Sequence, residues 1–300
     1  MKRVVVTGAT GFVGRRVVDA LVARGDSVTA LTRGSSRAAG QGLRFEHWDP
    51  MGDSPIPVLG EADAVIHLAG ERAVGTRWTA AVKREILQSR VRSTERLVAA
   101  MGRESRRPRV FVCASAVGYY GDRKDELVDE SSAPGDDFLA HVTVEWERAA
   151  LRAESLGIRV VRARLGIVMG RGGGALAEMV KPFKMFVGGP IGSGKQFVSW
   201  VHLEDVVSVL LRAVDDERLS GAVNVVAPHP VTNRELSSQI GKVLGRPSAF
   251  SVPAAALRLR FGEGAQPLVT GQRVKPGALE QIGYVFRHPD IAGALSEALS

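Results

Sequence analysis

A glycine-rich turn close to the amino end constrains this chain more than any other feature of the sequence. The apolar segment 3–7 predicts a buried strand, and apolar residues recur at helical spacing over residues 12–24. Between them, glycines allow a tight turn, close approach of a phosphate to the helix N-terminus, and close packing of the helix on the strand. The Gly-x-x-Gly-x-x-Gly spacing is one residue looser than the common dinucleotide motif. The residues expected to form a dinucleotide site here are Gly8, Thr10, Gly11, Phe12, Val13 and Gly14.

Short β-branched runs alternate with longer helical patterns through the first half of the chain. This alternation predicts parallel β-α-β units with right-handed crossovers, and so an α/β fold with a doubly wound parallel sheet of the Rossmann type. The further elements expected are strands at 27–31, 64–68, 110–114 and 158–161, helices at 78–101 and 137–156, and a loop at 49–60.

The local composition of the sequence changes after about residue 165, where Gly-rich stretches appear at 170–174 and 188–194. We expect residues 1–165 to form mainly the nucleotide-binding Rossmann domain, to which residues 197–226 return. Residues 166–300 are expected to form mainly a smaller substrate region, including a small C-terminal domain at about 248–300. The elements expected here are strands at 197–201 and 222–226, helices at 203–214 and 233–244, and a tail with a helix, a strand and a helix.

The end of the second predicted strand indicates which dinucleotide the site takes. An acidic residue about 20 positions beyond the glycines suits the ribose 2′-hydroxyl of NAD, whereas an arginine suits the 2′-phosphate of NADP. The strand ends at Thr32 and Arg33, 19 positions after Gly14 in the case of Arg33, with no carboxylate beside it in the sequence. The alternative is a plain surface cation. We expect NADP(H) as the cofactor, with Thr32 and Arg33 among its contacts.

Charge and cysteine content exclude several other kinds of site. The 40 Lys and Arg against 32 Asp and Glu give a net charge of +8, and the densest basic cluster is Arg103, Arg106, Arg107 and Arg109. No base-stacking aromatic residues accompany this cluster, so we expect a solvated loop and no nucleic-acid partner. The single cysteine, Cys113, excludes a disulfide framework, and the six histidines show no metal-ligand spacing, so no metal is expected.

No targeting or membrane-spanning segment is expected. The apolar run 4–6 stops at Thr7 and Gly8, well short of a signal-peptide core, and nowhere do about 18 apolar residues follow one another. We therefore expect a cytoplasmic protein without a membrane partner.

Three motifs together resemble the extended short-chain dehydrogenases/reductases: Thr7–Gly14, Leu68–Gly70 and Ser115–Gly121. With Gly188–Gly194 and Gly271–Arg273, the chain looks like their atypical NAD-dependent epimerase/dehydratase-like branch, which has a small C-terminal domain of unknown function. The resemblance covers essentially the whole chain and implies a Rossmann fold that binds NADP(H). The further cofactor contacts that it implies are Leu68, Ala69, Gly70, Glu85, Arg90 and Val168.

The catalytic pattern of that superfamily is only partly matched. Its members use a tyrosine as proton donor and a lysine four residues further along the same helix face. The helix predicted to start near Asp137 contains neither residue. Tyr120 and Lys124 repeat the spacing, but Gly121 and Asp122 predict a turn between them.

We expect any chemistry instead at the carboxyl end of strand 110–114, where Ser115, Tyr119 and Tyr120 follow. The alternative is that these residues only line a pocket. His141 or Glu145 on the next helix could substitute as acid or base, against the competing interpretation of a solvated helix face.

A second Gly-rich segment, 189–196, nearly matches the phosphate loop of nucleotide hydrolases. Gln196 stands where that loop needs a hydroxyl for magnesium, and a strand rather than a helix is predicted to follow. We therefore do not expect a kinase or NTPase. Val198 stands where nucleotide-sugar epimerases usually carry an arginine, which argues against a nucleotide-sugar substrate.

The expected function is that of an NADP(H)-dependent oxidoreductase of epimerase-like architecture, acting on an unidentified small molecule. The missing tyrosine–lysine pair leaves open a second class, a non-catalytic NADP(H)-binding or redox-sensing protein. The sequence predicts no particular oligomeric state.

Overall fold

Apolar, mostly β-branched strands build the central sheet. The computed structural model describes residues 1–52 and 55–300, and within them eight strands form one sheet. Neighbouring strands pair in parallel except for the edge pair β3–β4, which confirms the predicted doubly wound parallel sheet. In spatial order the strands are β12 (Gly221–Val225), β8 (Arg159–Leu165), β6 (Val110–Ala116), β5 (Ala64–His67), β1 (Arg3–Thr7), β2 (Ser27–Thr32), β4 (Leu43–His47) and β3 (Arg37–Ala38).

The strand order reverses between β1 and β5, and this reversal fixes where a ligand can bind. From β1 the chain builds outward through β2 and β4, and it then crosses over to build the other half through β5, β6, β8 and β12. At such a switch point the loops after the two central strands diverge and leave a crevice at their carboxyl ends. Here those loops begin at Gly8 and Leu68.

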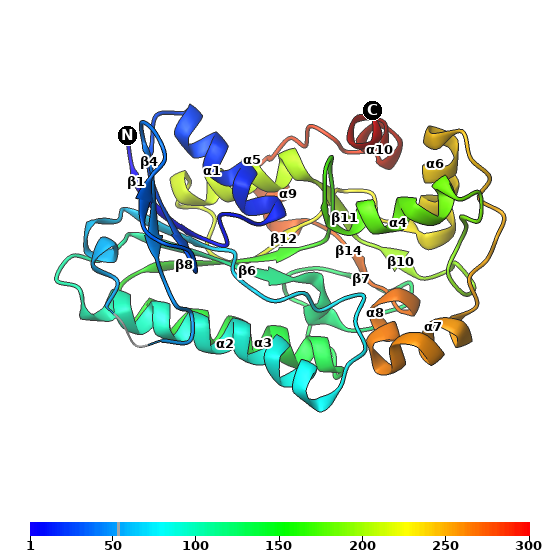
Figure 1. Ribbon diagram of the computed structural model, residues 1–300, viewed down its shortest axis with the longest axis horizontal. Helices are drawn as coiled ribbons and strands as arrows, with labels where there is room; N and C mark the ends of the chain where they lie inside the picture. Colours follow the sequence, from blue (N-terminus) through cyan, green and yellow to red (C-terminus); the bar gives the residue numbers. More distant parts are fainter. Residues whose placement is uncertain (53–54) are drawn as a thin grey trace.

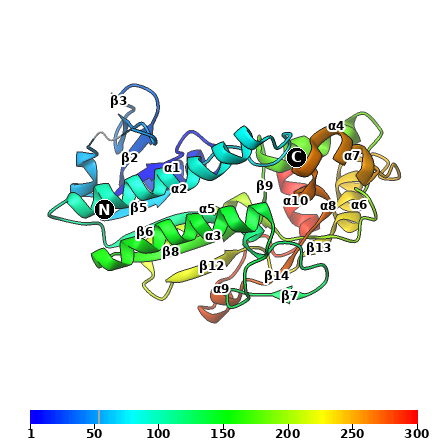
Figure 2. The same ribbon diagram turned by 90° about the horizontal axis from the view of Figure 1, so that it is seen from below.

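Two pairs of helices cover the two faces of the sheet, as Figures 1 and 2 show. Helices α1 and α5 pack on one face, in a core that includes Val6 and Leu21. Helices α2 and α3 pack on the other face, around Phe111 and Trp146. The bounds of these helices are α1 (Phe12–Ala23), α2 (Ala80–Arg103), α3 (Phe138–Leu151) and α5 (Leu203–Asp215).

Most of the remaining strands and helices gather at one end of the molecule (Figure 1), where Phe183, Trp200 and Leu295 belong to a smaller core. The strands are β7 (Leu127–Val128), β9 (Ile167–Met169), β10 (Phe197–Val198), β11 (Trp200–His202), β13 (Val231–Thr232) and β14 (Arg273–Val274). The helices are α4 (Gly174–Lys184), α6 (Asn233–Leu244), α7 (Ala254–Phe261), α8 (Gln266–Val269), α9 (Gly277–Gln281) and α10 (Ile291–Leu299). The 3-10 turns are η1 (Pro57–Glu61), η2 (Val117–Tyr120), η3 (Arg152–Leu156) and η4 (Gly262–Ala265).

The structure departs from the sequence prediction at several elements. β4 was not predicted, because this strand near the edge of the sheet is only half-buried and mixes charged with apolar residues. α4 was not predicted either, since it follows a Gly-rich stretch and contains Pro182; burial of Leu176, Val180 and Phe183 overrides those signals. The strand predicted at 197–201 is divided at Ser199 into β10 and β11.

The loop predicted at 49–60 includes positions 53 and 54, which lie outside the described residues, and it ends in η1. Among the helices of the described residues, none combines the length and the apolar character needed to cross a membrane.

Candidate functional site

The glycine turn after β1 has the geometry that a phosphate-binding turn needs. Gly8 has a left-handed φ of +67°, and a Cβ on it would lie 2.7 Å from the carbonyl carbon of Leu68. A Cβ on Gly14 would lie 2.0 Å from the Gly8 oxygen, so α1 can pack this closely only through a glycine. A Cβ on Gly11 would meet the same oxygen at 3.1 Å and, within the described part of the chain, no other non-adjacent atom closer than 4 Å. Gly8 and Gly14 therefore shape the turn, whereas Gly11 keeps it open to a ligand.

Helix α1 begins at this turn without a capping side chain. Its N-cap residue is Gly11, and its first turn carries no acidic residue. Unpaired amide groups and the helix dipole both favour an anion at such an end.

A buried relay of polar side chains joins the two loops of the crevice. Thr7 Oγ1 accepts a hydrogen bond from the Leu68 amide at 3.2 Å and lies 2.6 Å from His67 Nδ1. His67 Nε2 lies 3.0 Å from Thr94 Oγ1, which donates to the Arg90 carbonyl. Burial lowers the pKa of His67 to about 3, so the ring is neutral and accepts from Thr7 while donating to Thr94. The relay fixes the end of β1 to the end of β5 and to α2.

Arg33 stands at the rim of the crevice, directly after the last residue of β2, Thr32. Its side chain is 80% exposed, and its Nη1 lies 3.6 Å from Glu71 Oε1. Sequence reasoning missed this carboxylate, because Glu71 follows a different strand, β5, and is brought beside Arg33 only by the fold.

A groove of about 580 Å³ opens between these loops. Its walls also include Trp48 and residues 49–51, which follow β4, and Gln88 and Ser89 from α2. The predicted cofactor residues that line it are Gly8, Thr10, Gly11, Thr32, Arg33, Leu68, Ala69, Gly70 and Glu85.

The other predicted cofactor residues lie beside the groove rather than in its lining. Arg90 packs on Gly70, where an added Cβ would lie 3.4 Å from its Cζ, and its Nη2 donates to the Glu71 carbonyl at 2.8 Å. Phe12 packs against the loop before α4, with a Cβ on Gly173 placed 2.7 Å from its ring. The residues in this group are Phe12, Val13, Gly14, Arg90 and Val168, and their contact with a cofactor stays a prediction.

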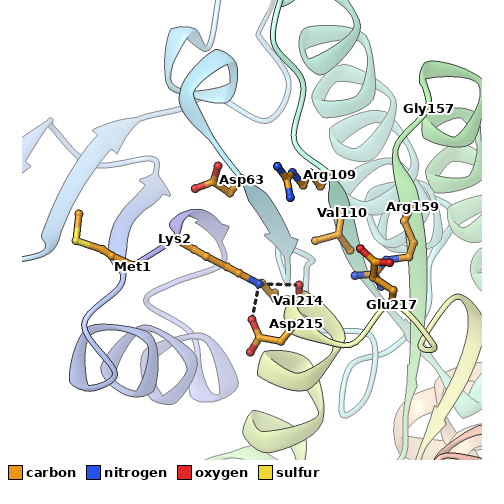
Figure 3. Close-up of a pocket in the computed structure, with 10 residues that line it drawn as sticks. All are labelled: Met1, Lys2, Asp63, Arg109, Val110, Gly157, Arg159, Val214, Asp215 and Glu217. Carbon is orange, nitrogen blue, oxygen red and sulfur yellow. Dashed lines mark hydrogen bonds and ion pairs between the residues drawn. The ribbon is translucent and has the colours of Figure 1, made fainter.

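A second hollow of about 580 Å³ lies at the opposite, amino end of the strands (Figure 3). Its charged lining residues are balanced, with Lys2, Arg109 and Arg159 against Asp63, Asp215 and Glu217. Lys2 Nζ donates to Asp215 Oδ1 at 2.6 Å. Arg106, one member of the basic cluster, pairs with Asp63 at the edge of this hollow.

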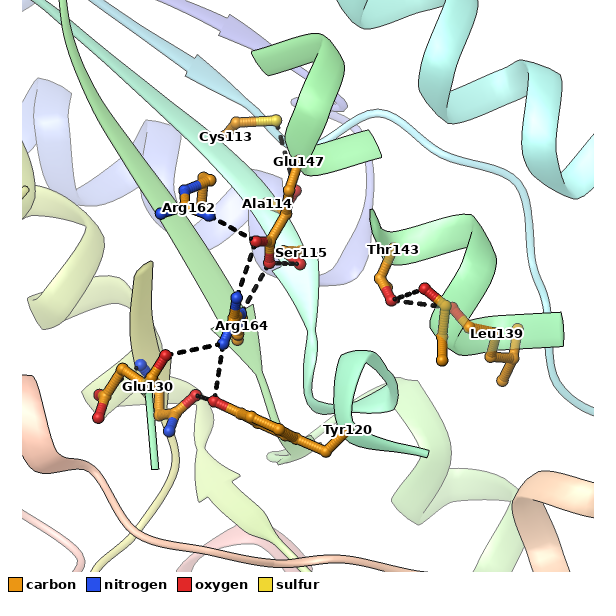
Figure 4. A network of polar contacts seen from close by, with 12 residues as sticks. Cys113, Ala114, Ser115, Tyr120, Glu130, Leu139, Thr143, Glu147, Arg162 and Arg164 are labelled. Atoms are coloured by element: carbon orange, nitrogen blue, oxygen red, sulfur yellow. Dashed lines mark hydrogen bonds and ion pairs between the residues drawn. The ribbon is translucent and has the colours of Figure 1, made fainter. Parts of the chain in front are cut away.

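A group of polar side chains is buried behind the carboxyl end of β6 (Figure 4). The carboxylate of Glu147 accepts from Nε and Nη2 of Arg164 at 2.8 and 2.9 Å. It also accepts from Arg162 Nη1 at 2.8 Å and from Ser115 Oγ at 2.7 Å. Burial by itself lowers the pKa of Arg164, but Glu147 and Tyr120 raise it above its ordinary value, so its guanidinium stays charged. The group that we call the polar cluster consists of Ser115, Tyr120, Glu147, Arg162, Arg164 and Asn224.

Two of the three predicted catalytic hydroxyls are committed inside the polar cluster. Ser115 donates to its carboxylate, and Tyr120 donates to Asn224 Oδ1 at 2.7 Å. Burial raises the pKa of Tyr120 to about 12. Tyr119 differs, because its ring lies 3.5 Å from the Arg164 guanidinium and its hydroxyl has no hydrogen-bond partner among the residues described. Tyr119 is thus the predicted catalytic hydroxyl that no other described side chain engages; the catalytic roles stay predictions.

Helix α3 contains neither a tyrosine nor a lysine. Leu139 and Thr143 stand one turn apart, and the Thr143 hydroxyl donates to the Leu139 carbonyl (Figure 4). His141 is exposed, and Glu145 forms a surface ion pair at 2.6 Å, so neither joins the polar cluster. Glu147, two positions further along α3, belongs to the polar cluster, and its role was not predicted from the sequence. The signal was the pair Arg162 and Arg164, which alternate with apolar residues in β8.

Two other motifs of the sequence have structural explanations. Tyr120 ends η2, whereas Lys124 lies exposed beyond it with a φ of +51°, so the two share no helix face. Residues 189–196 are followed by β10 rather than by a helix, as predicted, and Gln196 Nε2 donates to the carbonyls of Ile191 and Leu268. This segment is therefore not a phosphate loop.

His202 and His288 meet at the start of α5, with ring centroids 3.8 Å apart. Nε2 of His202 lies 2.7 Å from Glu297 Oε2, and its Nδ1 accepts from the Glu204 amide. His288 Nε2 lies 3.1 Å from Glu204 Oε2. Burial and then His288 lower the pKa of His202. With both His202 nitrogens engaged, the group caps α5 and ties it to α10.

Two family models match the chain. Residues 4–226 match the NAD dependent epimerase/dehydratase family, and residues 252–298 match a domain of unknown function, DUF1731. The "Epimerase family protein SDR39U1 homolog, chloroplastic" of Arabidopsis thaliana is 41% identical over 302 residues, which cover 97% of this chain and 84% of that protein.

Solved structures agree with this similarity. The crystal structure of human epimerase family protein SDR39U1 (isoform 2) with NADPH gives a TM-score of 0.89 at 36% identity, covering 99% of this chain and 98% of that chain. A nucleoside-diphosphate sugar epimerase from Corynebacterium glutamicum gives 0.80 at 34% identity, covering 99% of this chain and 58% of that one.

Proposed function

Because the chain belongs to the NAD-dependent epimerase/dehydratase family, we propose that it binds NADP(H) in the groove at the carboxyl ends of β1 and β5 and acts as an oxidoreductase on a small molecule. The observation that carries this proposal is the glycine turn, whose open position at Gly11 faces the groove at the uncapped start of α1. The NADPH named with the human relative supports the choice of dinucleotide.

The residues present fit an NADP(H) molecule. A side chain at Gly11 would fill space that a pyrophosphate needs, and the free amides of α1 suit its charge. Arg33 at the rim can pair with a 2′-phosphate, because most of its guanidinium is exposed. The lining of Trp48, Leu68 and Ala69 offers the apolar surface that a base and ribose need.

When bound, the dinucleotide supplies a hydride donor or acceptor. The chain itself must then supply a proton to the reacting oxygen or remove one from it. Tyr119 is the best placed of the predicted groups, because its hydroxyl is uncommitted and its ring lies against the charged Arg164. Ser115 and Tyr120 hold the loop in place through the polar cluster.

The test is turnover of a panel of small carbonyl compounds with NADPH, followed by nicotinamide absorbance. We expect Tyr119→Phe to lower the turnover of any substrate found by about 100-fold while NADPH affinity is unchanged. Tyr120→Phe is the matched control, whose main expected effect is on stability. Full turnover in both variants and in the double variant would contradict the role of this loop.

A second function is favoured by a specific observation on α3. With neither a tyrosine nor a lysine on this helix, the chain can bind NADP(H) without turning it over, as a binding or redox-sensing protein. Tight NADPH binding without turnover of any panel member would favour this function over the oxidoreductase.

A further inference from the structure

The rim of the groove holds two opposite charges close together. Arg33 and Glu71 follow β2 and β5, the two strands that flank β1 in the sheet, and Arg33 Nη1 lies 3.6 Å from Glu71 Oε1. Arg90 Nη2 donates to the backbone carbonyl of Glu71 at 2.8 Å, which holds this residue at the groove wall independently of its own side chain. Both Arg33 and Glu71 line the groove.

The pair is weak enough for a ligand to open it. The side chains are 80% and 45% exposed, and exposed pairs of this kind contribute little to stability. A 2′-phosphate that reaches Arg33 must take the guanidinium from Glu71 and then stand near its negative charge. A ribose 2′-hydroxyl has no such cost, because a hydroxyl can donate to a carboxylate.

We propose that Glu71 is a second determinant of nucleotide choice in this groove. It occupies Arg33 in the free protein, weakens the binding of a 2′-phosphate, and accepts a hydrogen bond from the 2′-hydroxyl of NAD(H). The groove therefore takes both dinucleotides, and Arg33 and Glu71 set the preference against each other. This inference rests on the proposed binding of NADP(H).

The experiment compares NADPH and NADH titrations of the full-length wild type with Glu71→Gln. The variant keeps the size of the side chain and the backbone contact to Arg90. We expect NADPH to bind about threefold to tenfold more tightly at low ionic strength, with NADH affinity unchanged or lower. The gain should shrink at high salt, because an exposed charge is screened.

Glu95→Gln is the matched control. It removes the same charge from α2. Glu95 is not part of the groove lining, and its carboxylate lies 2.9 Å from Arg152 Nη1. This variant should leave the ratio of the NADPH and NADH affinities unchanged. Glu71→Asp keeps the charge and should keep a ratio closer to that of wild type.

The outcomes separate the inference from the proposed function. If the wild type binds neither nucleotide, both are wrong. If it binds NADPH but Glu71→Gln leaves the affinity ratio unchanged, or strengthens both nucleotides equally, Glu71 does not determine the choice, while the proposed binding function stands.

Discussion

The groove and the polar cluster lie at the carboxyl ends of neighbouring strands, yet they are built by opposite means. The groove depends largely on the absence of side chains, since Gly8, Gly11 and Gly14 leave room for backbone and ligand to approach. The polar cluster is formed by side chains that satisfy one another, with Glu147 accepting four hydrogen bonds from Arg162, Arg164 and Ser115.

This difference separates binding from stability. A groove with uncommitted amides and an exposed Arg33 has polar groups to offer a ligand. A cluster whose charges are already paired has few, and it holds the loop of Tyr119 and Tyr120 against β8 instead. We therefore expect substitutions in the cluster to change the free energy of unfolding, and substitutions in the groove to change nucleotide affinity.

The largest change in the free energy of unfolding is expected from a substitution that disrupts the polar cluster. Glu147→Gln leaves the guanidinium of Arg164 buried without a counter-charge, so the free energy of unfolding should fall by about 3–5 kcal/mol. Glu145→Gln, two residues away, loses only a surface pair with Arg148 and should cost at most about 1 kcal/mol. Urea denaturation measures both. Equal losses in the two variants would show that the cluster is not the stabilising element.

The relay behind the groove should make stability depend on pH. The unfolded chain protonates His67 near its ordinary pKa of 6.5, whereas the folded protein does so only near pH 3. Between these values the unfolded state binds more protons, so stability rises with pH and is lost as the pH falls. From pH 6.5 to 4 this group should remove about 3 kcal/mol.

Comparing unfolding free energies at these two pH values in wild type and His67→Gln isolates this contribution. The variant should show a flatter dependence, whereas His141→Gln, at an exposed position of α3, should behave as wild type. A wild-type slope that persists in His67→Gln would assign the effect to other groups.

Within the groove, the glycines should separate binding from folding. Gly11→Val places a side chain where the ligand approaches, and should weaken NADPH binding by at least about 100-fold, or about 2.7 kcal/mol, in a folded protein. Gly14→Val instead collides with the Gly8 oxygen and should lower stability as well. Circular dichroism and nucleotide titration distinguish the two. A native-like Gly11→Val that binds NADPH normally would move the site elsewhere.

The glycine turn at the start of the groove could be predicted from the sequence because its requirements are local. The strand, the turn and the helix of Arg3–Ala23 follow one another, and each glycine is needed by its own backbone or by a close neighbour. The position of Arg33, directly after β2, was also visible, since it depends only on the length of the β-α-β unit.

The polar cluster and Glu71 could not be predicted in this way. Tyr120 and Asn224 are 104 positions apart, and Arg164 and Glu147 are 17 apart on different elements. Such pairs are set by strand order and helix rotation, which no local pattern specifies. β4 was missed for a different reason, because a half-buried strand near the sheet edge needs little apolar periodicity.

The most direct test of the account is the pair of affinities of the wild-type protein for NADPH and NADH, measured by fluorescence titration. The pairing of Arg33 with a 2′-phosphate should favour NADPH by about 1–3 kcal/mol, reduced by Glu71 toward the lower end, and Arg33→Asp should abolish or reverse the preference. Equal affinities in the wild type, or a preference for NADH, would contradict the claim that this groove reads the 2′-phosphate.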